Sequence, residues 1–264
     1  MAATPNFELI EPARPVLFVF ATAREACGAI REIAEADEGD FESWRAVPLG
    51  ENDASRIDVL VTGVGKANAA AAAARALDPA RHGLIVSAGI GGVYPAAHAR
   101  GLALGDVVAA SACVFADEGV ESDTGFMDLA ALGFGPMTGA ASPARRDANT
   151  MWDGSRCVPC AGALDLFIRS GCKAAEVATV STCAGTDARA ADMERRSACA
   201  VEAMEGAAVA LVAARLGVPF AEVRAISNTT GARARQVWRV GPALEALARV
   251  LGRAHASGWR VRPR

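Results

Sequence analysis

Largely apolar runs that alternate with helical segments constrain the fold of this chain more than any other feature of its sequence. We expect strands at residues 16–22, 57–62, 84–87, 106–115, 174–180 and 219–227. Several of these runs are apolar at successive positions, which is typical of strands that are buried on both faces in α/β proteins. The sequence therefore predicts an α/β fold: a single three-layer αβα domain with a central mixed, twisted sheet.

Helical composition and the segment boundaries complete this prediction. We expect helices at 23–36, 67–77, 161–169, 188–198, 206–216 and 240–254. Residues 117–158 hold many Gly, Pro and polar residues, which predicts a long and partly irregular excursion. Because no linker and no internal repeat divides the chain, we expect one domain over 16–254, with an N-terminal extension at 1–15 and a basic tail at 255–264.

Composition argues against several classes of protein. The net charge of −3 offers no electrostatic grip on nucleic acid. No apolar run reaches the roughly 18 residues that would cross a membrane, and the first residues lack a signal-peptide pattern, so we expect a cytoplasmic protein. The 7 cysteines are odd in number and show no disulfide framework. Cys157 and Cys160 form a lone C-x-x-C without a second pair or a nearby His, so we expect neither a metal nor an organic cofactor.

Glycine-rich segments follow two of the expected strands, at the edge of the sheet where α/β proteins bind their ligands: Gly63-Val-Gly65 after 57–62 and Gly89-Ile-Gly91-Gly92 after 84–87. Gly63-Val-Gly65 lacks the third glycine of a dinucleotide-binding fingerprint, which disfavours an NAD-dependent dehydrogenase. Gly65-Lys66-Ala67 lacks the Ser or Thr of a P-loop. Such segments are equally consistent with tight strand-to-helix turns and with backbone that contacts a ligand directly.

Glu205 is a more specific signal, because it is a carboxylate among small apolar residues in the stretch VEAMEGAA at 201–208. An acid there is expected to be partly buried, and a buried carboxylate needs strong hydrogen-bond donors. Two interpretations stay open from the residues alone. Glu205 is either a functional acid or a helix N-terminal acid that backbone N–H groups satisfy.

Together, these segments resemble the purine nucleoside phosphorylase and nucleosidase superfamily over roughly residues 16–251. The most specific stretches are 201–208 (VEAMEGAA) and 224–228 (RAISN), and supporting stretches are 62–66, 87–92 and 104–107. The resemblance implies that Glu205 holds the ribose hydroxyls and that Met204 packs on the sugar. This role suits cleavage of an N-glycosidic bond, because hydrogen bonds from sugar hydroxyls to a carboxylate strengthen as the sugar becomes oxocarbenium-like.

Asn228 is an informative departure within the resemblance. Adenine-directed nucleosidases of the superfamily carry Asp here, which can deliver a proton to N7 of the base. An Asn amide has two donor protons and an acceptor oxygen but no titrating proton, which fits a 6-oxopurine and fits adenine poorly. Protonation of the leaving base would then be relayed, for example through water.

Further stretches narrow the expected substrate. They are 116–121 followed by Gly125-Phe126, 181–186, and 231–235 followed by Trp238. Here the chain looks most like a hydrolase of an inosine-like nucleoside with a carboxyphenyl ketone at its 5′ end. Arg233 and Arg235 would then grip the carboxylate, and Phe126 or Trp238 would stack on the ring. The alternative for the two arginines is a solvated basic loop.

The water-activating base is expected just after the first strand, where related nucleosidases use a Glu. Direct alignment places Ala26 at that position, with Glu25 one residue away. We favour Glu25, and Asp187, Glu118 and Glu121 are the alternatives. Without this role, Glu25 would be an exposed acid in the first turn of a helix.

The sequence thus predicts an N-glycosyl hydrolase for a small-molecule purine nucleoside, working as a homo-oligomer of two or more copies. Its expected catalytic residues are Glu25, Glu205 and Asn228, and its expected substrate-binding residues are Gly89, Gly92, Phe126, Gly185, Thr186, Met204, Ser227, Arg233, Arg235 and Trp238. Two alternatives stay open. One is a phosphorolytic purine nucleoside phosphorylase, for which Arg24 is a candidate phosphate ligand, and the other is a non-catalytic nucleoside-binding protein on the same fold.

Overall fold

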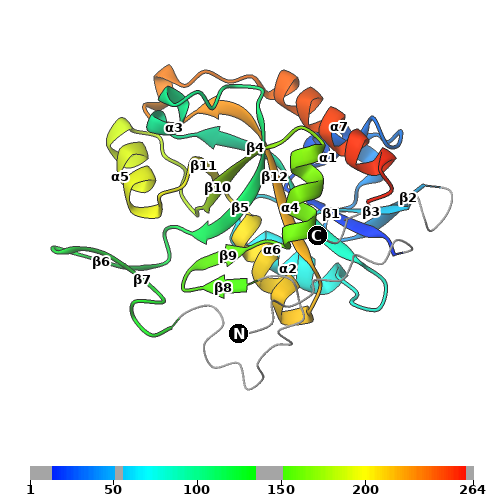
Figure 1. Ribbon diagram of the computed structural model, residues 1–264, viewed down its shortest axis with the longest axis horizontal. Coiled ribbons are helices and arrows are strands. Elements are labelled where there is room, and N and C mark those ends of the chain that lie inside the picture. Colours follow the sequence, from blue (N-terminus) through cyan, green and yellow to red (C-terminus); the bar gives the residue numbers. More distant parts are fainter. Residues whose placement is uncertain (1–13, 51–55, 135–150, 260–264) are drawn as a thin grey trace, which may run out of the picture.

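A central mixed sheet organises the computed structural model, which describes residues 14–50, 56–134 and 151–259 (Figure 1). Within these residues its strand order is β2-β3-β1-β4-β11-β10-β5-β9-β8, and β12 pairs with both β4 and β5. The strands of this sheet are β1 (Val16–Phe20), β2 (Ala46–Leu49), β3 (Ile57–Val61), β4 (Leu84–Val93), β5 (Val107–Phe115), β8 (Met151–Asp153), β9 (Arg156–Val158), β10 (Lys173–Thr179), β11 (Val201–Ala203) and β12 (Phe220–Thr229).

The long strand β12 closes part of this sheet into a ring. It runs parallel to β4 and antiparallel to β5. Since β4 also pairs with β11, β11 with β10 and β10 with β5, these five strands form a closed, barrel-like circuit. β1 lies parallel to β3 and β4 beside the ring, so the carboxyl ends of several strands meet at one edge.

Helices cover both faces of the sheet. Both layers are needed because successive side chains of β1 point to opposite faces and are buried on each. Val16, Phe18 and Phe20 contribute to one buried core, and Leu17 and Val19 contribute to another. Helices α1, α4 and α7 pack on the first core, and α2 and α6 pack on the second. The helices are α1 (Ala23–Ile30), α2 (Lys66–Ala76), α3 (Pro95–Ala99), α4 (Ala161–Arg169), α5 (Asp187–Ser197), α6 (Gly206–Leu216) and α7 (Val240–Ala256). The predicted three-layer α/β fold is therefore confirmed.

Two expectations about strand ends are wrong. The strand expected at 84–87 continues as β4 to Val93, so the segment Gly89–Gly92 is strand rather than a turn. The glycines are needed there because neighbouring strands approach closely. A Cβ on Gly91 would lie 2.8 Å from Val201 Cγ1, and one on Gly92 would lie 2.9 Å from Asn228 Nδ2. Likewise, β12 continues past the expected end at 227 to Thr229.

The described residues of the excursion expected at 117–158 contain four short strands. β6 (Gly119–Ser122) and β7 (Gly125–Asp128) form a hairpin that extends away from the body of the molecule (Figure 1). β8 and β9 add to the edge of the main sheet beside β5, where Cys157 of β9 lies opposite Cys113. Residues 135–150 lie outside the described part of the chain.

The domain continues beyond the predicted boundary at residue 254. Helix α7 runs to Ala256, and the buried Trp259 ring lies 5.4 Å from the Phe18 ring, centroid to centroid. Residues 1–13 of the predicted extension and 260–264 of the predicted tail lie outside the described residues. In the part of the chain that the structure describes, no helix is long and apolar enough to span a bilayer.

A buried ionic cluster ties β3 to the turn before β4, away from the strand ends that carry the predicted site. The Asp58 carboxylate accepts hydrogen bonds from Arg81 Nε at 2.7 Å and Arg81 Nη2 at 2.9 Å, and lies 3.0 Å from His82 Nε2. Burial raises the pKa of Asp58, but the hydrogen bonds from His82 and Arg81 outweigh this effect and hold the pKa below its ordinary value.

We predict that Asp58→Asn lowers the free energy of unfolding by about 2 kcal/mol at neutral pH, because it removes a buried charge from the half-buried Arg81 and the buried His82. Since the folded-state pKa is depressed, the stabilisation is lost as pH falls through that pKa, and variant and wild type should converge in acid. Denaturant titration across pH measures this difference. Equal unfolding free energies at neutral pH would show that the cluster does not stabilise the fold.

Candidate active site

A cavity of about 580 Å³ opens at the strand ends where the predicted site residues gather. Its wall includes residues that follow β1, residues of β4 and β11, the segment between β10 and α5, and the end of β12. Of the predicted site residues, those that line it are Glu25, Gly92, Gly185, Met204, Glu205, Asn228, Arg233 and Trp238. The structure thus brings all three predicted catalytic residues into one cavity.

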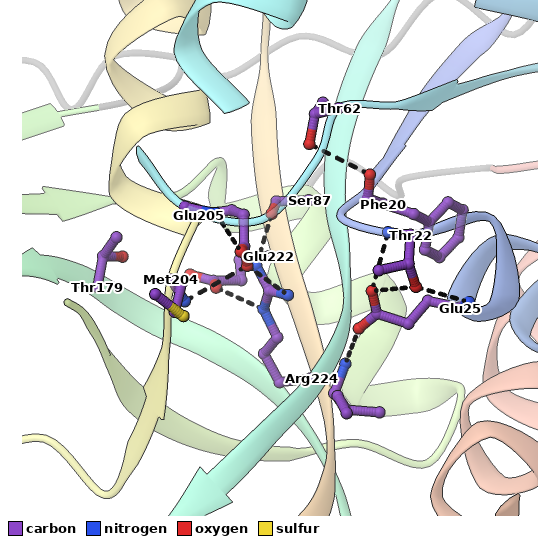
Figure 2. Close-up of polar contacts among 12 residues, drawn as sticks. Phe20, Thr22, Glu25, Thr62, Ser87, Thr179, Met204, Glu205, Glu222 and Arg224 are labelled. Carbon is purple, nitrogen blue, oxygen red and sulfur yellow. Dashed lines mark hydrogen bonds and ion pairs between the residues drawn. The ribbon is translucent and has the colours of Figure 1, made fainter. Parts of the chain in front are cut away.

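Arg224 forms the centre of the ionic network behind this cavity (Figure 2). Its side chain is fully buried, and its Nε donates to Glu222 Oε1 at 2.8 Å and its Nη2 to Ser87 Oγ at 2.8 Å. Its Nη1 lies 3.3 Å from Glu205 Oε2. Burial lowers the pKa of Arg224, but the carboxylates of Glu222 and Glu205 outweigh burial and raise it above its ordinary value.

Sequence analysis did not single out Arg224 as a site residue. A signal was present, because Glu222 and Arg224 are opposite charges two residues apart in a largely apolar strand, and buried charges need partners of opposite charge. The partners of Arg224 lie on β4, on β12 itself and at the start of α6, so only the folded sheet shows which charge it meets.

The Glu205 carboxylate is held by donors that leave it facing the cavity. Oε1 accepts from Gly65 N–H at 3.1 Å, and Oε2 accepts from Met204 N–H at 3.3 Å and contacts Arg224. Glu205 is the N-cap of α6, yet its side chain makes no capping hydrogen bond to that helix. A carboxylate offers about four lone-pair directions, so it can still accept from a ligand hydroxyl. The structure therefore does not show the simple helix-terminus role that the residues alone left open.

Glu25 combines a local structural role with a place in the cavity wall. It is the third residue of α1 and closes a capping box, in which Oε2 accepts from Thr22 N–H and Oγ1–H, each at 3.1 Å. Its Oε1 accepts from Ile90 N–H at 3.1 Å. Burial raises the pKa of Glu25, an effect that the Ile90 hydrogen bond and the positive charge of Arg224 only partly offset. The neighbouring Ala26 is buried in the core instead.

The three alternative acids lie outside the cavity lining. Glu118 lies 3.0 Å from Lys66 Nζ, and Glu121 is on the exposed hairpin strand β6. Asp187 is exposed, accepts from Ala232 N–H at 2.8 Å and pairs with Arg235. Their side chains are therefore committed elsewhere or directed to solvent.

Asn228 keeps one donor and one acceptor available. Its Oδ1 accepts from Ser227 Oγ–H at 2.8 Å, and its Nδ2 donates to the Thr229 carbonyl at 3.0 Å. A second amide proton and a second lone pair remain. The fully buried Ser227 therefore supports Asn228 from behind, and Gly92 leaves room for the amide, because a Cβ there would lie 2.9 Å from Nδ2.

Glu202 also lines the cavity, although sequence analysis assigned it no role. Its two oxygens accept from Ala184 N–H at 3.0 and 3.1 Å, and Oε2 also accepts from Tyr94 O–H at 3.2 Å. Burial raises its pKa, and the donors from Ala184 and Tyr94 act in the opposite direction. Glu202 and Asn228 both align with Gly92, from the two strands that flank β4. Glu202 was missed because β11 is only three residues long.

Arg233 and Trp238 form one rim of the cavity. The Arg233 guanidinium lies 4.8 Å from the centre of the Trp238 ring, and its Nη1 donates to Gln236 Oε1 at 2.9 Å. Arg235, two residues on, lies outside the lining and pairs with the exposed Asp187. The structure therefore separates the two arginines that the sequence treated alike.

The remaining predicted residues take different positions. Gly89 lies behind the cavity between two charged groups, since a Cβ there would lie 2.8 Å from both Glu25 Oε1 and Arg224 Nη1. Thr186 caps α5 by accepting from Arg189 N–H, and Phe126 lies on the hairpin under the Arg196 guanidinium. Neither Thr186 nor Phe126 lines the cavity of this chain.

Comparison with known proteins identifies the family to which this chain belongs. Residues 47–257 match the family model of the phosphorylase superfamily. The futalosine hydrolase of Streptomyces coelicolor is 40% identical over 203 residues, which are 74% of this chain and 77% of that protein. The futalosine hydrolase of Thermus thermophilus is 37% identical over 235 residues, 87% of this chain and 92% of that protein. The chain therefore belongs to the futalosine hydrolase family within this superfamily.

A solved structure supports the fold independently. The native structure of futalosine hydrolase of Helicobacter pylori superposes with a TM-score of 0.67 over 93% of this chain and 98% of that chain. Its sequence identity is 16%, so this likeness concerns the fold alone.

We predict that Glu25→Gln lowers kcat by about 100-fold or more, because an amide cannot take a proton from water. The raised pKa of Glu25 further predicts that wild-type kcat/KM declines in acid with an apparent pKa above that of an ordinary Glu. Because burial penalises the ionised form, the variant should gain stability relative to wild type as pH rises through this pKa. Steady-state kinetics and thermal melts across pH measure both effects.

The matched control is Glu118→Gln, which removes another proposed acid outside the cavity lining. It should leave kcat and its pH dependence unchanged. A Glu25→Gln variant that retains more than half of the wild-type kcat would exclude Glu25 as the base.

Proposed function

We propose that this protein hydrolyses the N-glycosidic bond of futalosine and releases hypoxanthine and dehypoxanthine futalosine, as a step of menaquinone biosynthesis. The single observation that carries this proposal is the Glu205 carboxylate. It faces the cavity, is fixed by Gly65, Met204 and Arg224, and retains capacity to accept from a sugar hydroxyl. The futalosine hydrolases of Streptomyces coelicolor and Thermus thermophilus, at 40% and 37% identity, support the choice of substrate.

The sugar is activated through Glu205. In this account the ribose hydroxyls donate to its carboxylate, and Met204 packs against the sugar. As the C1′–N9 bond lengthens, its electron pair moves to the base and positive charge develops on the sugar. The hydroxyl hydrogen bonds then strengthen, so that Glu205 stabilises the transition state more than the ground state.

Water completes the reaction with Glu25 as base. The water oxygen bonds to C1′ and its proton passes to the Glu25 carboxylate, whose raised pKa favours proton uptake. The departing base takes up one proton from solvent through a water relay, because the Asn228 amide has no titrating proton to give, and Glu25 afterwards returns its proton to solvent. One water molecule is consumed in total. The sugar gains a hydroxyl group at C1′, and the released base gains one proton.

The base is oriented by the free groups of Asn228. Its remaining amide proton donates to the 6-oxo group, and its remaining oxygen lone pair accepts from N7–H once the departing base is protonated at N7. An adenine would meet this pair with the wrong polarity at the 6-amino group. Gly185 and Gly92 line the same part of the cavity and leave backbone exposed to the base.

The scarcity of cations in the cavity lining favours water over phosphate as the acceptor. Among its described lining residues the cations are Arg24 and Arg233, while Glu25, Glu202 and Glu205 are acidic. Arg224 is enclosed behind Glu205 and bonded to it. A phosphate dianion generally needs several converging donors.

We predict phosphate-independent turnover. Incubation with futalosine should release hypoxanthine at the same rate with and without inorganic phosphate, and chromatography of the products should show no sugar phosphate. Release that depends on phosphate would establish a phosphorylase instead. Tight purine nucleoside binding without turnover would establish a non-catalytic binding protein.

Arg233 is proposed to hold the carboxylate of the 5′ arm, with Trp238 against the aromatic ring. We predict that Arg233→Met raises KM for futalosine about tenfold or more and leaves KM for inosine within about twofold, because inosine lacks the carboxylate. The control is Arg235→Met, which removes an arginine outside the cavity lining. Equal effects of Arg233→Met on both substrates would contradict the role, as would an equal effect of Arg235→Met.

We also propose that the protein works in the cytoplasm as a homo-oligomer. The odd number of cysteines without a disulfide framework supports a reducing compartment. The β6–β7 hairpin supports association, because Val120 and Met127 face each other across it and are 45% and 42% exposed. An isolated two-stranded hairpin is marginal in water, and a neighbouring subunit would bury these side chains.

A further inference from the structure

Glu222 is a buried acid behind the cavity that the proposed reaction does not use. It lies on β12, two residues before Arg224, and is 1% exposed. Its Oε1 accepts from Arg224 Nε at 2.8 Å, while its Oε2 has no hydrogen-bond partner among the described residues. A carboxylate oxygen that is buried without a partner is unfavourable for stability, so its presence calls for a functional reason.

The surroundings of Glu222 leave Arg224 as its counter-ion. A Cβ on Gly206 would lie 2.0 to 2.2 Å from the carboxylate atoms, so glycine at the start of α6 makes room for this group. The Cys113 thiol also donates a hydrogen bond to the Glu222 carboxylate, and burial, reinforced by the charge of Glu222 and by this hydrogen bond, raises the pKa of Cys113 well above its ordinary value. A neutral thiol cannot compensate the negative charge of a carboxylate. The Arg224 guanidinium is therefore the group that compensates the charge of Glu222.

Arg224 is therefore one cation shared between two carboxylates. It lies closer to Glu222, at 2.8 Å, than to Glu205, at 3.3 Å. Without Glu222 the guanidinium would serve Glu205 as its main partner, with Glu25 close by on the other side of Gly89. A full ion pair would neutralise Glu205 and occupy lone pairs that a sugar hydroxyl needs.

We propose that Glu222 is a positioning residue that draws Arg224 away from Glu205 and so preserves the negative charge of Glu205 for the sugar. This inference rests on the proposed role of Glu205 in binding ribose. Because Glu205 and Glu222 share the single positive charge of Arg224, this group of three side chains keeps a net negative charge next to the sugar, even when Glu25 is protonated. That charge favours an oxocarbenium-like sugar over the neutral ground state, so Glu222 acts on kcat more than on KM.

The test is Glu222→Gln, which keeps a similar shape and an acceptor for Arg224 Nε but removes the charge. We expect kcat for futalosine to fall about tenfold or more, with KM within about threefold of wild type. Affinity for a hypoxanthine nucleoside analogue with a protonated iminoribitol ring should fall by a similar factor. Affinity for the matching analogue with a neutral ring should change by less than about threefold.

Two further variants separate this role from a structural one. Glu222→Met removes the charge without placing an unpaired amide in the interior, so it carries the same test if Glu222→Gln does not fold. Asp58→Asn removes the charge of another buried carboxylate that pairs with an arginine, at a position remote from the cavity. It should lower thermal stability while leaving kcat and both affinities unchanged.

The outcomes are distinct. A folded Glu222→Gln or Glu222→Met protein with kcat within twofold of wild type would overturn the inference, and so would a parallel loss of affinity for both analogues. If wild type binds the cationic analogue more tightly than the neutral one but does not cleave futalosine, the proposed function fails and the binding comparison still decides the role of Glu222. If wild type shows no preference for the cationic analogue, the inference itself fails.

Discussion

The buried guanidinium of Arg224 is the interaction on which the rest of the site depends. It bonds to Glu222 and Ser87, and it contacts Glu205 at the cavity wall. Removal of a buried arginine from such a cluster would leave two carboxylates without compensation, which is far more costly than the net value of the ion pairs suggests. The Glu205 carboxylate is therefore held in two ways. The Arg224 guanidinium attracts it from behind the cavity, and the backbone N–H groups of Gly65 and Met204 donate hydrogen bonds to it.

Small residues make this concentration of charge possible. Gly89 leaves room between Glu25 and Arg224, and Gly206 leaves room for the Glu222 carboxylate. Gly65 has a φ of 95°, a conformation that glycine adopts without strain, and there its N–H donates to Glu205. These glycines therefore matter less for backbone flexibility than for the space that the missing side chain leaves. That space lets strands, backbone donors and charged groups approach one another.

Much of the fold could be predicted from the sequence, because apolar runs indicate buried strands and segments of helical composition indicate helices. Helices 161–169 and 206–216 begin and end as predicted. The boundaries failed where tertiary packing overrides local pattern, as at Gly89 to Gly92, which look like a turn and are strand. Glu205 could be singled out from its type and position, and Asn228 and Glu25 from the resemblance to the superfamily. Arg224 and Glu202 could not, because they meet groups that are distant in the sequence, such as Ser87 and Glu205 for Arg224 and Tyr94 for Glu202. Glu222 pairs with Arg224 on its own strand, but its enclosure against Gly206 appears only in the fold. The separation of Arg233 from Arg235 required the cavity itself.

The most direct test of the account is whether Glu205 recognises the ribose hydroxyls in the transition state. The measurement is kcat/KM for futalosine and for its 2′-deoxy analogue, in wild type and in Glu205→Gln. The account predicts a penalty of about tenfold or more for the deoxy substrate in wild type, since this hydrogen bond strengthens as the sugar gains charge. In Glu205→Gln the penalty should largely disappear. An equal penalty in both proteins would contradict the central role given to Glu205.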